Sequence, residues 1–239
     1  MGRKQEIDLN ALSAMENDAR REMQDSRLSN NKKDTILWAA MKMFLENGYS
    51  NTSLRQIAQE SGTSASLIIY HYGTKQAIAE EYMNGKMREL RHALMQKVDI
   101  RSEPELFCCT FVRLYQSVMA SPNFCRFYHD IIEEGVFRSF FFEDDVYGIN
   151  VSDLILAKRQ VQLSSNMYSF YSHYIIPGIE LASWISEGEK APEGDKLDVP
   201  FRALMGIIYV PKEEVDGYCA QAKMLVDKIL AEHPQFLEL

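Results

Sequence analysis

The stretch ILWAAMKMFLENGYSNTSLRQIAQESGTSASLIIYHYGTKQAI, residues 36–78, decides the fold of this chain. Its apolar residues recur at intervals of three and four, which is the spacing of one face of an α-helix. Ile36, Ala40 and Phe44 form such a face and predict a first helix over about residues 33–47. Gly48 follows as a residue that ends helices readily, because glycine takes the left-handed conformation.

Two shorter helices are predicted after the first one. Ser53 and Gln56 have the three-residue spacing of a capping box, which marks the start of the second helix. The segment ESGTS, residues 60–64, ends it after about two turns. Ser64 can then cap a third helix over about residues 65–72. Three helices, with a short glycine-containing turn between the last two, indicate a helix-turn-helix unit.

The third helix is predicted to contact DNA. Small residues at its N-terminal end allow a close approach to base edges in the major groove. Base contacts are expected from Ala65, Ser66, Leu67 and Ile69, and phosphate contacts from Tyr70, His71 and Lys75. The second helix of such units crosses the phosphate backbone. With its first residues included, the predicted DNA-binding set is Thr52, Ser53, Arg55, Ser64, Ala65, Ser66, Leu67, Ile69, Tyr70, His71 and Lys75.

The alternative is that the tyrosines of this segment are core aromatics. Part of it is expected to hold, because Tyr72 lies one turn after Ile68, the predicted inward anchor of the third helix. Tyr72 should therefore be half-buried, whereas Tyr70 and His71 should face outward. Thr74 is predicted to cap a long fourth helix that reaches about residue 98.

The stretch resembles the DNA-binding domain of the TetR family of bacterial transcription regulators. The resemblance rests on the Ile-Leu-x-Ala-Ala start at 36–40, Phe44, Gly48-Tyr49, Thr52-Ser53, Ile57-Ala58, Gly62, Ser64, Tyr70-His71-Tyr72 and Lys75. Ser66, Leu67 and Ile69 depart from the Gly, Thr and Tyr common in the family, which makes the base-reading surface more apolar. The resemblance implies a variable C-terminal helical domain that binds a small effector.

Charge is distributed unevenly along the chain. The net charge is −8, yet residues 1–100 carry 14 basic and 13 acidic residues, while residues 101–239 carry 12 and 21. Residues 1–30 form a polar N-terminal extension with a thin apolar face. The basic residues Arg27, Lys32 and Lys33 fit a DNA-contacting arm and a solvated tail about equally.

Residues 79–239 are predicted to form a larger helical domain for effector binding and dimerisation. Helices are expected at about 104–120, from Pro122 onward, and at about 151–174, 195–209 and 212–232. Twenty of the chain's aromatic residues lie beyond residue 100, and pockets between bundle helices are mainly apolar. The candidate ligand-binding residues are Phe111, Tyr115, Phe127, Tyr128, Phe170, Tyr174 and Trp184.

The last helix carries a coiled-coil-like pattern. Its apolar residues Val215, Cys219, Ala222, Val226 and Ile229 are spaced by four, three, four and three. We therefore expect the last two helices to form a four-helix bundle between two subunits. The predicted dimer interface is Phe201, Leu204, Ile208, Cys219, Ala222, Val226 and Ile229.

No metal or cofactor site is predicted. The cysteines Cys108, Cys109, Cys125 and Cys219 form no zinc-binding spacing and are expected to be free, buried apolar groups. His129 and Glu133 have i, i+4 spacing but lack a third ligand at fixed spacing. With no secretory signal and no apolar run of the roughly 18 residues that a membrane span needs, a cytoplasmic location is expected.

The sequence thus predicts an all-α, homodimeric DNA-binding regulator: residues 1–30 as an extension, 31–78 as the helix-turn-helix domain and 79–239 as the effector and dimerisation domain. A repressor, released from a palindromic operator by a small, largely apolar or aromatic effector, fits this arrangement. The alternatives are a helical protein-interaction adaptor and a regulator without a small-molecule effector. An enzyme would need convergent titratable groups, for which His129 and Glu133 are the only weak candidates.

Overall fold

A computed structural model describes residues 31–136, 145–146, 149–164, 179 and 193–238 of the chain. In these ranges the regular secondary structure is helical apart from one pair of two-residue antiparallel strands, in which Val146 pairs with Ile149. After a helix over residues 31–47, the elements are α2 (Leu54–Glu60), α3 (Ala65–Tyr72), α4 (Lys75–Met95), α5 (Pro104–Met119), α6 (Cys125–Glu133), β1 (Asp145–Val146), β2 (Ile149–Asn150), α7 (Val151–Arg159), the 3-10 helix η2 (Gly194–Asp198), α9 (Val199–Ile207), α10 (Lys212–Glu232) and the 3-10 helix η3 (Pro234–Leu237).

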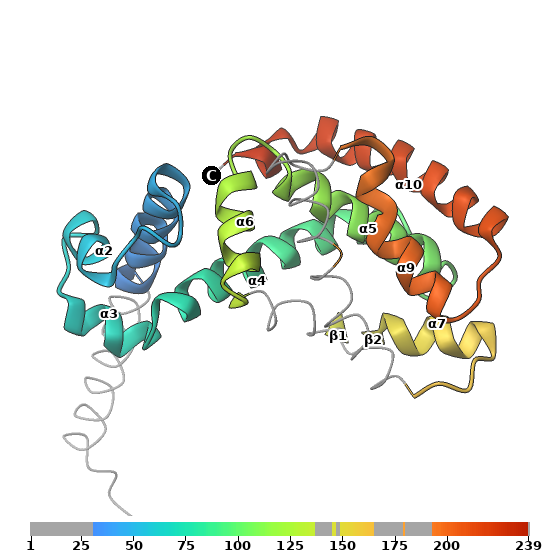
Figure 1. The fold of residues 1–239 in the computed structure, drawn as a ribbon, viewed down its shortest axis with the longest axis horizontal. Coiled ribbons are helices and arrows are strands. Elements are labelled where there is room, and N and C mark those ends of the chain that lie inside the picture. Colours follow the sequence, from blue (N-terminus) through green and yellow to red (C-terminus); the bar gives the residue numbers. More distant parts are fainter. Residues whose placement is uncertain (1–30, 137–144, 147–148, 165–178, 180–192, 239) are drawn as a thin grey trace, which may run out of the picture.

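The first three helices form the predicted helix-turn-helix unit at one end of the molecule (Figure 1). Ile36, Ala40 and Phe44 are fully buried, as the helical spacing predicted. Ile57 and Ile68 are fully buried as well, and the five side chains belong to one core. This shared core is necessary because α2 and α3 have only seven and eight residues, too few to be stable in isolation.

Side-chain caps fix where these short helices begin. The Ser53 hydroxyl accepts a hydrogen bond from the Gln56 amide, and the Gln56 side chain accepts one from the Ser53 amide, so the predicted capping box is confirmed. Ser64 caps α3 and Thr74 caps α4 in the same way, through the amides of Leu67 and Ala77. Each cap satisfies an amide that would otherwise lack a partner.

Helix α4 connects the helix-turn-helix unit with the rest of the chain (Figure 1). It is continuous over 21 residues and buries Ile78 and Ala79 near its start and Leu90 and Leu94 near its end. Its first turns therefore pack with the helix-turn-helix unit and its last turns with the C-terminal helices. A continuous helix of this length can transmit a movement from one part of the chain to the other.

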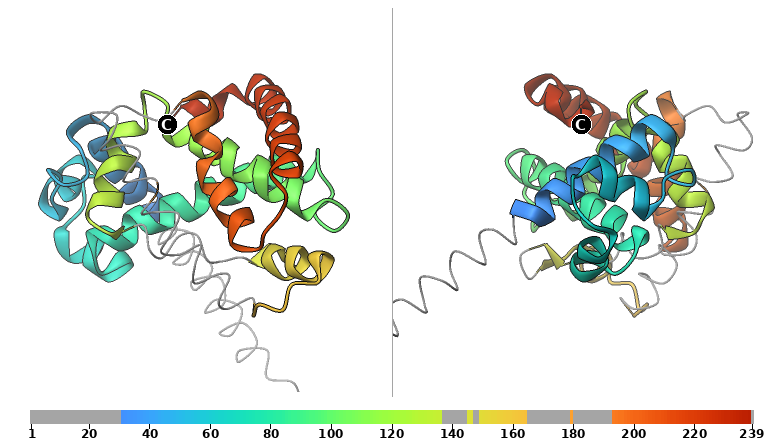
Figure 2. Two further views of the ribbon diagram at one scale, coloured as in Figure 1. Left: turned by 45° about the vertical axis from the view of Figure 1, so that its right-hand side comes forward. Right: turned by 90° about the vertical axis from the view of Figure 1, so that its left-hand side faces the viewer.

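Helix α5 is the centre of the C-terminal part, with α4 on one side and α9 and α10 beside it (Figure 2). Fourteen of its 16 residues are buried, so it is covered all round rather than along one face. Its most extensive contact is with α10. In the described ranges, no helix combines the length and apolar character needed to cross a bilayer.

Two predicted helix boundaries were wrong. The helix expected over 151–174 ends at Arg159, because Gln160 has a φ of 55° and so leaves the right-handed helical conformation. The helix expected to start at 195 begins instead with the 3-10 turn Gly194–Asp198, and α9 proper starts at Val199.

The predicted dimer interface was also wrong in its residues. Phe201, Leu204, Ile208, Cys219, Ala222, Val226 and Ile229 are each at most 6% exposed within a single chain. They belong to the chain's own core, where α9 and α10 pack against α5. The apolar spacing of four and three residues on α10 therefore does mark a buried face, but α5 of the same chain covers that face.

Candidate nucleic-acid interface

Helix α3 offers one face to solvent and holds the other in the core. Ile68 is fully buried, while Ser64, Ala65 and Ser66 are exposed and Leu67 is half-buried. Ile69 is 55% exposed and Tyr70 is 80% exposed, although both side chains are large and largely apolar or aromatic. Exposed groups of this kind on a rigidly supported helix favour contact with another molecule.

Tyr70 and His71 continue this face toward the C-terminal end of α3. Their rings lie 5.1 Å apart between centroids in an edge-to-face arrangement. Tyr72 is half-buried, as predicted, and its hydroxyl donates a 3.0 Å hydrogen bond to the backbone carbonyl of Lys33. Burial raises the pKa of Tyr72, so this phenol stays a neutral donor. Tyr72 therefore supports the helix and Tyr70 is available at its surface.

Two residues at the start of α2 are exposed next to this face. Ser53 and Arg55 are solvent-accessible, and no ion pair to Arg55 is found among the described residues. Thr52, which was predicted beside them, is instead 2% exposed, and its hydroxyl donates to the backbone carbonyls of Met43 and Gly48. The prediction of a DNA contact from the Thr52 side chain is corrected: it stabilises the turn before α2.

Lys75 has a structural role that the sequence did not predict. Its Nζ donates a 2.9 Å hydrogen bond to the carbonyl of Tyr49 and lies 4.0 Å from the centroid of the Tyr49 ring. This cation–π contact and hydrogen bond fasten the start of α4 to the end of the first helix. Lys75 is therefore a positioning residue for α4, and the phosphate contact predicted for its ammonium group stays a prediction.

Other basic side chains of the unit are engaged in ion pairs. Lys33 lies 3.0 Å from Glu81 and Lys42 lies 2.6 Å from Glu60. The hydrogen bond with Glu60 raises the pKa of Lys42. These exposed pairs contribute little to stability, because water and salt screen them, and they can exchange for phosphate partners. Arg55 can bind a phosphate without first breaking an ion pair to another described residue.

Helix α6 contacts the helix-turn-helix unit at the end of its first helix. The rings of Phe127 and Phe44 stack with centroids 5.7 Å apart and an interplanar angle of 8°. Arg126 donates a 2.9 Å hydrogen bond to the carbonyl of Asn47, and the Ser50 amide donates one of 3.3 Å to Asp130. A shift of α6 would therefore displace its contacts at the end of the first helix of the helix-turn-helix unit.

Gly48 lies at the centre of this contact. Its φ is +89°, and a Cβ there would lie 2.9 Å from a carboxylate oxygen of Asp130. Gly62 has a φ of +62° but an added Cβ would meet nothing within 4 Å. Alanine substitutions at the two glycines therefore distinguish the cost of a positive φ from the cost of a crowded Cβ.

We expect Gly48→Ala to destabilise the chain more than Gly62→Ala. The positive φ costs each alanine about 1–2 kcal/mol, and only Gly48→Ala adds the clash with α6. Urea denaturation of both variants measures the difference. Equal losses would show that α6 yields freely at this point.

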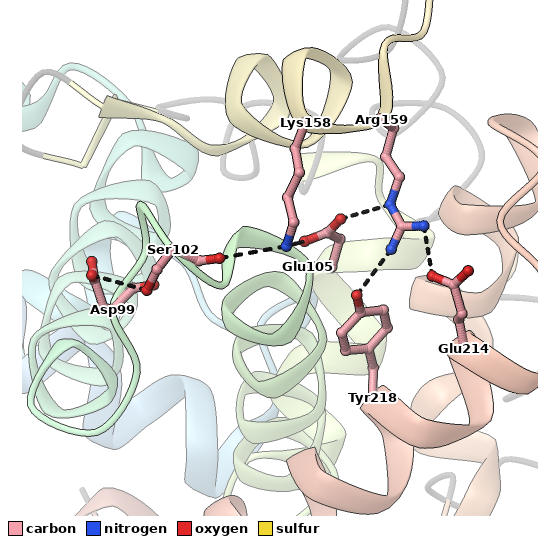
Figure 3. A network of polar contacts seen from close by, with 7 residues as sticks. All are labelled: Asp99, Ser102, Glu105, Lys158, Arg159, Glu214 and Tyr218. Carbon is pink, nitrogen blue, oxygen red and sulfur yellow. Dashed lines mark hydrogen bonds and ion pairs between the residues drawn. The ribbon is translucent and has the colours of Figure 1, made fainter.

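A polar network connects α7 with α5 and α10 (Figure 3). Glu105 is fully buried, and its carboxylate accepts 2.7 Å hydrogen bonds from Lys158 and Arg159. Arg159 also donates to Glu214 at 2.6 Å and to the hydroxyl of Tyr218 at 2.9 Å. Burial alone would raise the pKa of Glu105, but the bonds from the two cations hold that pKa below its usual range.

This network predicts a pH dependence of stability. Because the folded state lowers the pKa of Glu105, its contribution is present above the unfolded value of about 4.3 and is lost as pH falls through the lower folded value. Glu105→Gln should reduce the free energy of unfolding at pH 7 by about 1.5–3 kcal/mol. In this variant the free energy of unfolding should also fall less steeply as the pH drops below ~5. Urea unfolding at several pH values measures this, and an unchanged acid limb in the variant would contradict it.

The predicted ligand-binding aromatics lie in the core where they are described. Phe111, Tyr115, Phe127 and Tyr128 are at most 8% exposed. The rings of Tyr115 and Tyr128 meet edge to face at 5.5 Å, and Arg91 lies 5.0 Å from the Phe111 ring. Phe127 also contacts the helix-turn-helix unit through Phe44, and its predicted ligand contact stays a prediction. Phe170, Tyr174 and Trp184 lie outside the described residues.

One cluster of possible metal ligands was not predicted from the sequence. Cys109 on α5, Cys219 on α10 and Asp198 before α9 are all buried, and their ligand atoms lie within 4.8 Å of one another. The residues are far apart in the chain, so their spacing carried no signal. His129 and Glu133 lie 4.0 Å apart on α6.

Comparison with known proteins agrees with the unit described above. Residues 36–82 match the family of bacterial regulatory proteins called the tetR family. No curated protein matches the chain. Among solved structures, a tetR family transcription regulator from Shewanella sp. PV-4 is similar with 16% identity and a TM-score of 0.46, covering 74% of this chain and 97% of its own.

Two further solved structures are similar to a comparable extent. A tetR-family transcriptional regulator from Mesorhizobium loti MAFF303099 has 16% identity and a TM-score of 0.44, covering 75% of this chain and 97% of its own. A gamma-butyrolactone receptor described as ArpA-like has 15% identity and a TM-score of 0.42, covering 84% and 98%. The match with the tetR family is confined to residues 36–82.

Proposed function

We propose, from the membership of residues 36–82 in the tetR family of bacterial regulatory proteins, that this chain is a repressor that binds a palindromic operator as a homodimer and leaves it when a small effector binds. The single observation that carries the proposal is the face of α3: Ile69 and Tyr70 are exposed on a helix that Ile68 anchors in the core. Such a helix can enter the major groove without rearrangement.

The chemistry of the side chains on α3 determines which of them would contact bases and which would contact phosphates. Ser66 supplies a hydroxyl for a base edge, and the apolar surfaces of Ala65, Leu67 and Ile69 suit thymine methyl groups. Tyr70 and Arg55 are placed to donate to phosphates, which position the protein on the duplex. Base preference would thus depend on thymine-containing steps.

Two copies of α3 would read two half-sites. A symmetric dimer gives an operator with two-fold symmetry, in which the half-sites lie one helical turn or a multiple of it apart. Selection of bound sites from random duplex DNA by the full-length protein tests this. We expect inverted repeats; selected sites without two-fold symmetry would contradict the dimeric mode of binding.

The dimer surface is proposed on the outer faces of α9 and α10. On α10 the face opposite the buried seam carries Gly217, Ala220 and Met224, all exposed, with Met224 72% exposed. Gly206 and Val199 are exposed on α9. Small residues allow two helices to approach closely, and an exposed methionine supplies apolar area to bury. We name these five residues the dimer surface.

Met224→Glu should convert the dimer to a monomer. The change places a charge at the centre of the dimer surface, where burial would leave it without a partner. Lys223→Glu is the matched control, because it introduces the same carboxylate one residue away, about 100° around the helix. Analytical ultracentrifugation measures both. A dimeric Met224→Glu protein would place the interface elsewhere.

The proposed effector acts through α4 and α6. Both helices reach from the C-terminal part to the helix-turn-helix unit, α4 through Lys75 and α6 through Phe127. A ligand that favours one placement of these helices changes the separation of the two α3 helices, and DNA then opposes that ligand reciprocally. The second candidate, a regulator without an effector, predicts that small apolar and aromatic compounds leave operator affinity unchanged.

A further inference from the structure

We propose that Cys109, Cys219 and Asp198 form a binding site for a thiophilic divalent cation, with zinc as the ion. The cluster joins three elements, since Cys109 lies on α5, Cys219 on α10 and Asp198 at the start of α9. The three side chains are at most 4% exposed. The proposal does not depend on DNA binding, because none of the three residues belongs to the helix-turn-helix unit: they lie on α5, η2 and α10.

The distance between the sulfurs fits a metal better than a disulfide. The two Sγ atoms lie 3.9 Å apart. A tetrahedral zinc ion with bonds of about 2.3 Å holds two thiolates about 3.8 Å apart, whereas a disulfide needs about 2.0 Å. The cation can therefore enter between the sulfurs almost without movement of α5 or α10.

Asp198 supplies a carboxylate whose position is fixed by a buried arginine. Its Oδ1 accepts a 2.6 Å hydrogen bond from Arg113, which is itself buried and donates a second bond to the carbonyl of Gly194. A carboxylate has two oxygens, so it can bind the guanidinium group and a metal at once. This is the usual arrangement in which an outer group fixes a metal ligand.

The charges of the pocket balance when the cation binds. Without it, two neutral thiols lie beside the ion pair of Arg113 and Asp198. Binding of Zn²⁺ forms two zinc–thiolate bonds and releases two protons to solvent, so the net charge of the buried group is unchanged. Sulfur ligands select zinc over the hard cations magnesium and calcium. Three protein ligands leave the fourth position of the tetrahedron open.

The cation would clamp α10 and α9 onto α5. Helices α9 and α10 carry the proposed dimer surface, and the contact between α5 and α10 is the most extensive one between described elements. Binding should therefore raise the melting temperature, because the metal binds the folded chain with its ligands assembled.

Cobalt(II) titration of the full-length protein tests the site. The protein is kept reduced by a phosphine under anaerobic conditions, and thiolate-to-cobalt charge-transfer absorption in the near ultraviolet reports the bond. We expect saturation at one equivalent and displacement of cobalt by zinc. No such absorption, or absorption without saturation, would overturn the site.

Cysteine variants assign the ligands. Cys109→Ser and Cys219→Ser should each lose the absorption and the zinc-dependent rise in melting temperature. Cys125→Ser is the control, since this thiol lies outside the cluster and contacts the carbonyl of Pro122; it should behave as wild type. Where a serine variant fails to fold, the alanine variant of the same cysteine replaces it.

Two other outcomes would also contradict the proposal. Absorption that survives in both serine variants, or disappears in Cys125→Ser, would place the metal elsewhere. Reduced protein that binds no cobalt but forms a disulfide between Cys109 and Cys219 in air would make the cluster a redox pair rather than a metal site.

Discussion

Phe127→Ala should cost about 3–5 kcal/mol of the free energy of unfolding, the usual cost of removing a fully buried phenylalanine ring. Phe127 is fully buried and stacks on Phe44 of the first helix. Its ring also meets Tyr49 at 6.4 Å and Tyr82 of α4 at 6.3 Å. The variant would leave a cavity where α6, α4 and the first helix converge.

The same variant should weaken the coupling between the two parts of the chain. Phe111→Ala is the matched control, because Phe111 is buried on α5 within the C-terminal part. Both variants should lower the melting temperature, but only Phe127→Ala should separate the unfolding of the helix-turn-helix unit from that of the remainder. Scanning calorimetry distinguishes the two. A single transition in both variants would show that α6 is not the connection.

The double variant Ile69→Ala/Tyr70→Ala should weaken binding to the selected duplex by about 100-fold. Each side chain is expected to supply a contact in the range of 1–3 kcal/mol, Ile69 to a thymine methyl group and Tyr70 to a phosphate. Both side chains are exposed, so their truncation leaves no cavity and the fold should be unchanged.

Trp38→Ala is the control for that double variant. Trp38 is 58% exposed and lies in the same unit, but on the first helix rather than on α3. Fluorescence anisotropy with a labelled duplex measures all three proteins. Near wild-type affinity in the double variant, or an equal loss in Trp38→Ala, would remove α3 from the interface.

Local features of the fold were predictable from the sequence because they depend on neighbouring residues. Ser53 with Gln56, and Ser64 and Thr74, define helix starts through contacts three residues away. The buried face of the first helix follows from its periodicity. By contrast, Gln160 ends α7 although glutamine favours helices, and no nearby proline or glycine indicates this end.

Side-chain roles in the site were less predictable because they depend on distant contacts. Lys75 and Thr52 look like phosphate contacts in the sequence, yet both donate to carbonyls near the end of the first helix. The sequence of α10 shows an apolar seam at Cys219 and Ala222 but not the surface that covers it. Helix α5 covers it, and Cys109 and Cys219 meet there although 110 residues separate them.

The most direct measurement of the central claim compares two duplexes. Wild-type protein is titrated with the selected duplex and with a shuffled duplex of the same composition, at physiological salt and over a series of salt concentrations. We expect the protein to bind the selected duplex at least about 10³-fold more tightly than the shuffled one, with an affinity that falls as salt rises. Equal affinity for the two duplexes, or binding to neither, would contradict it.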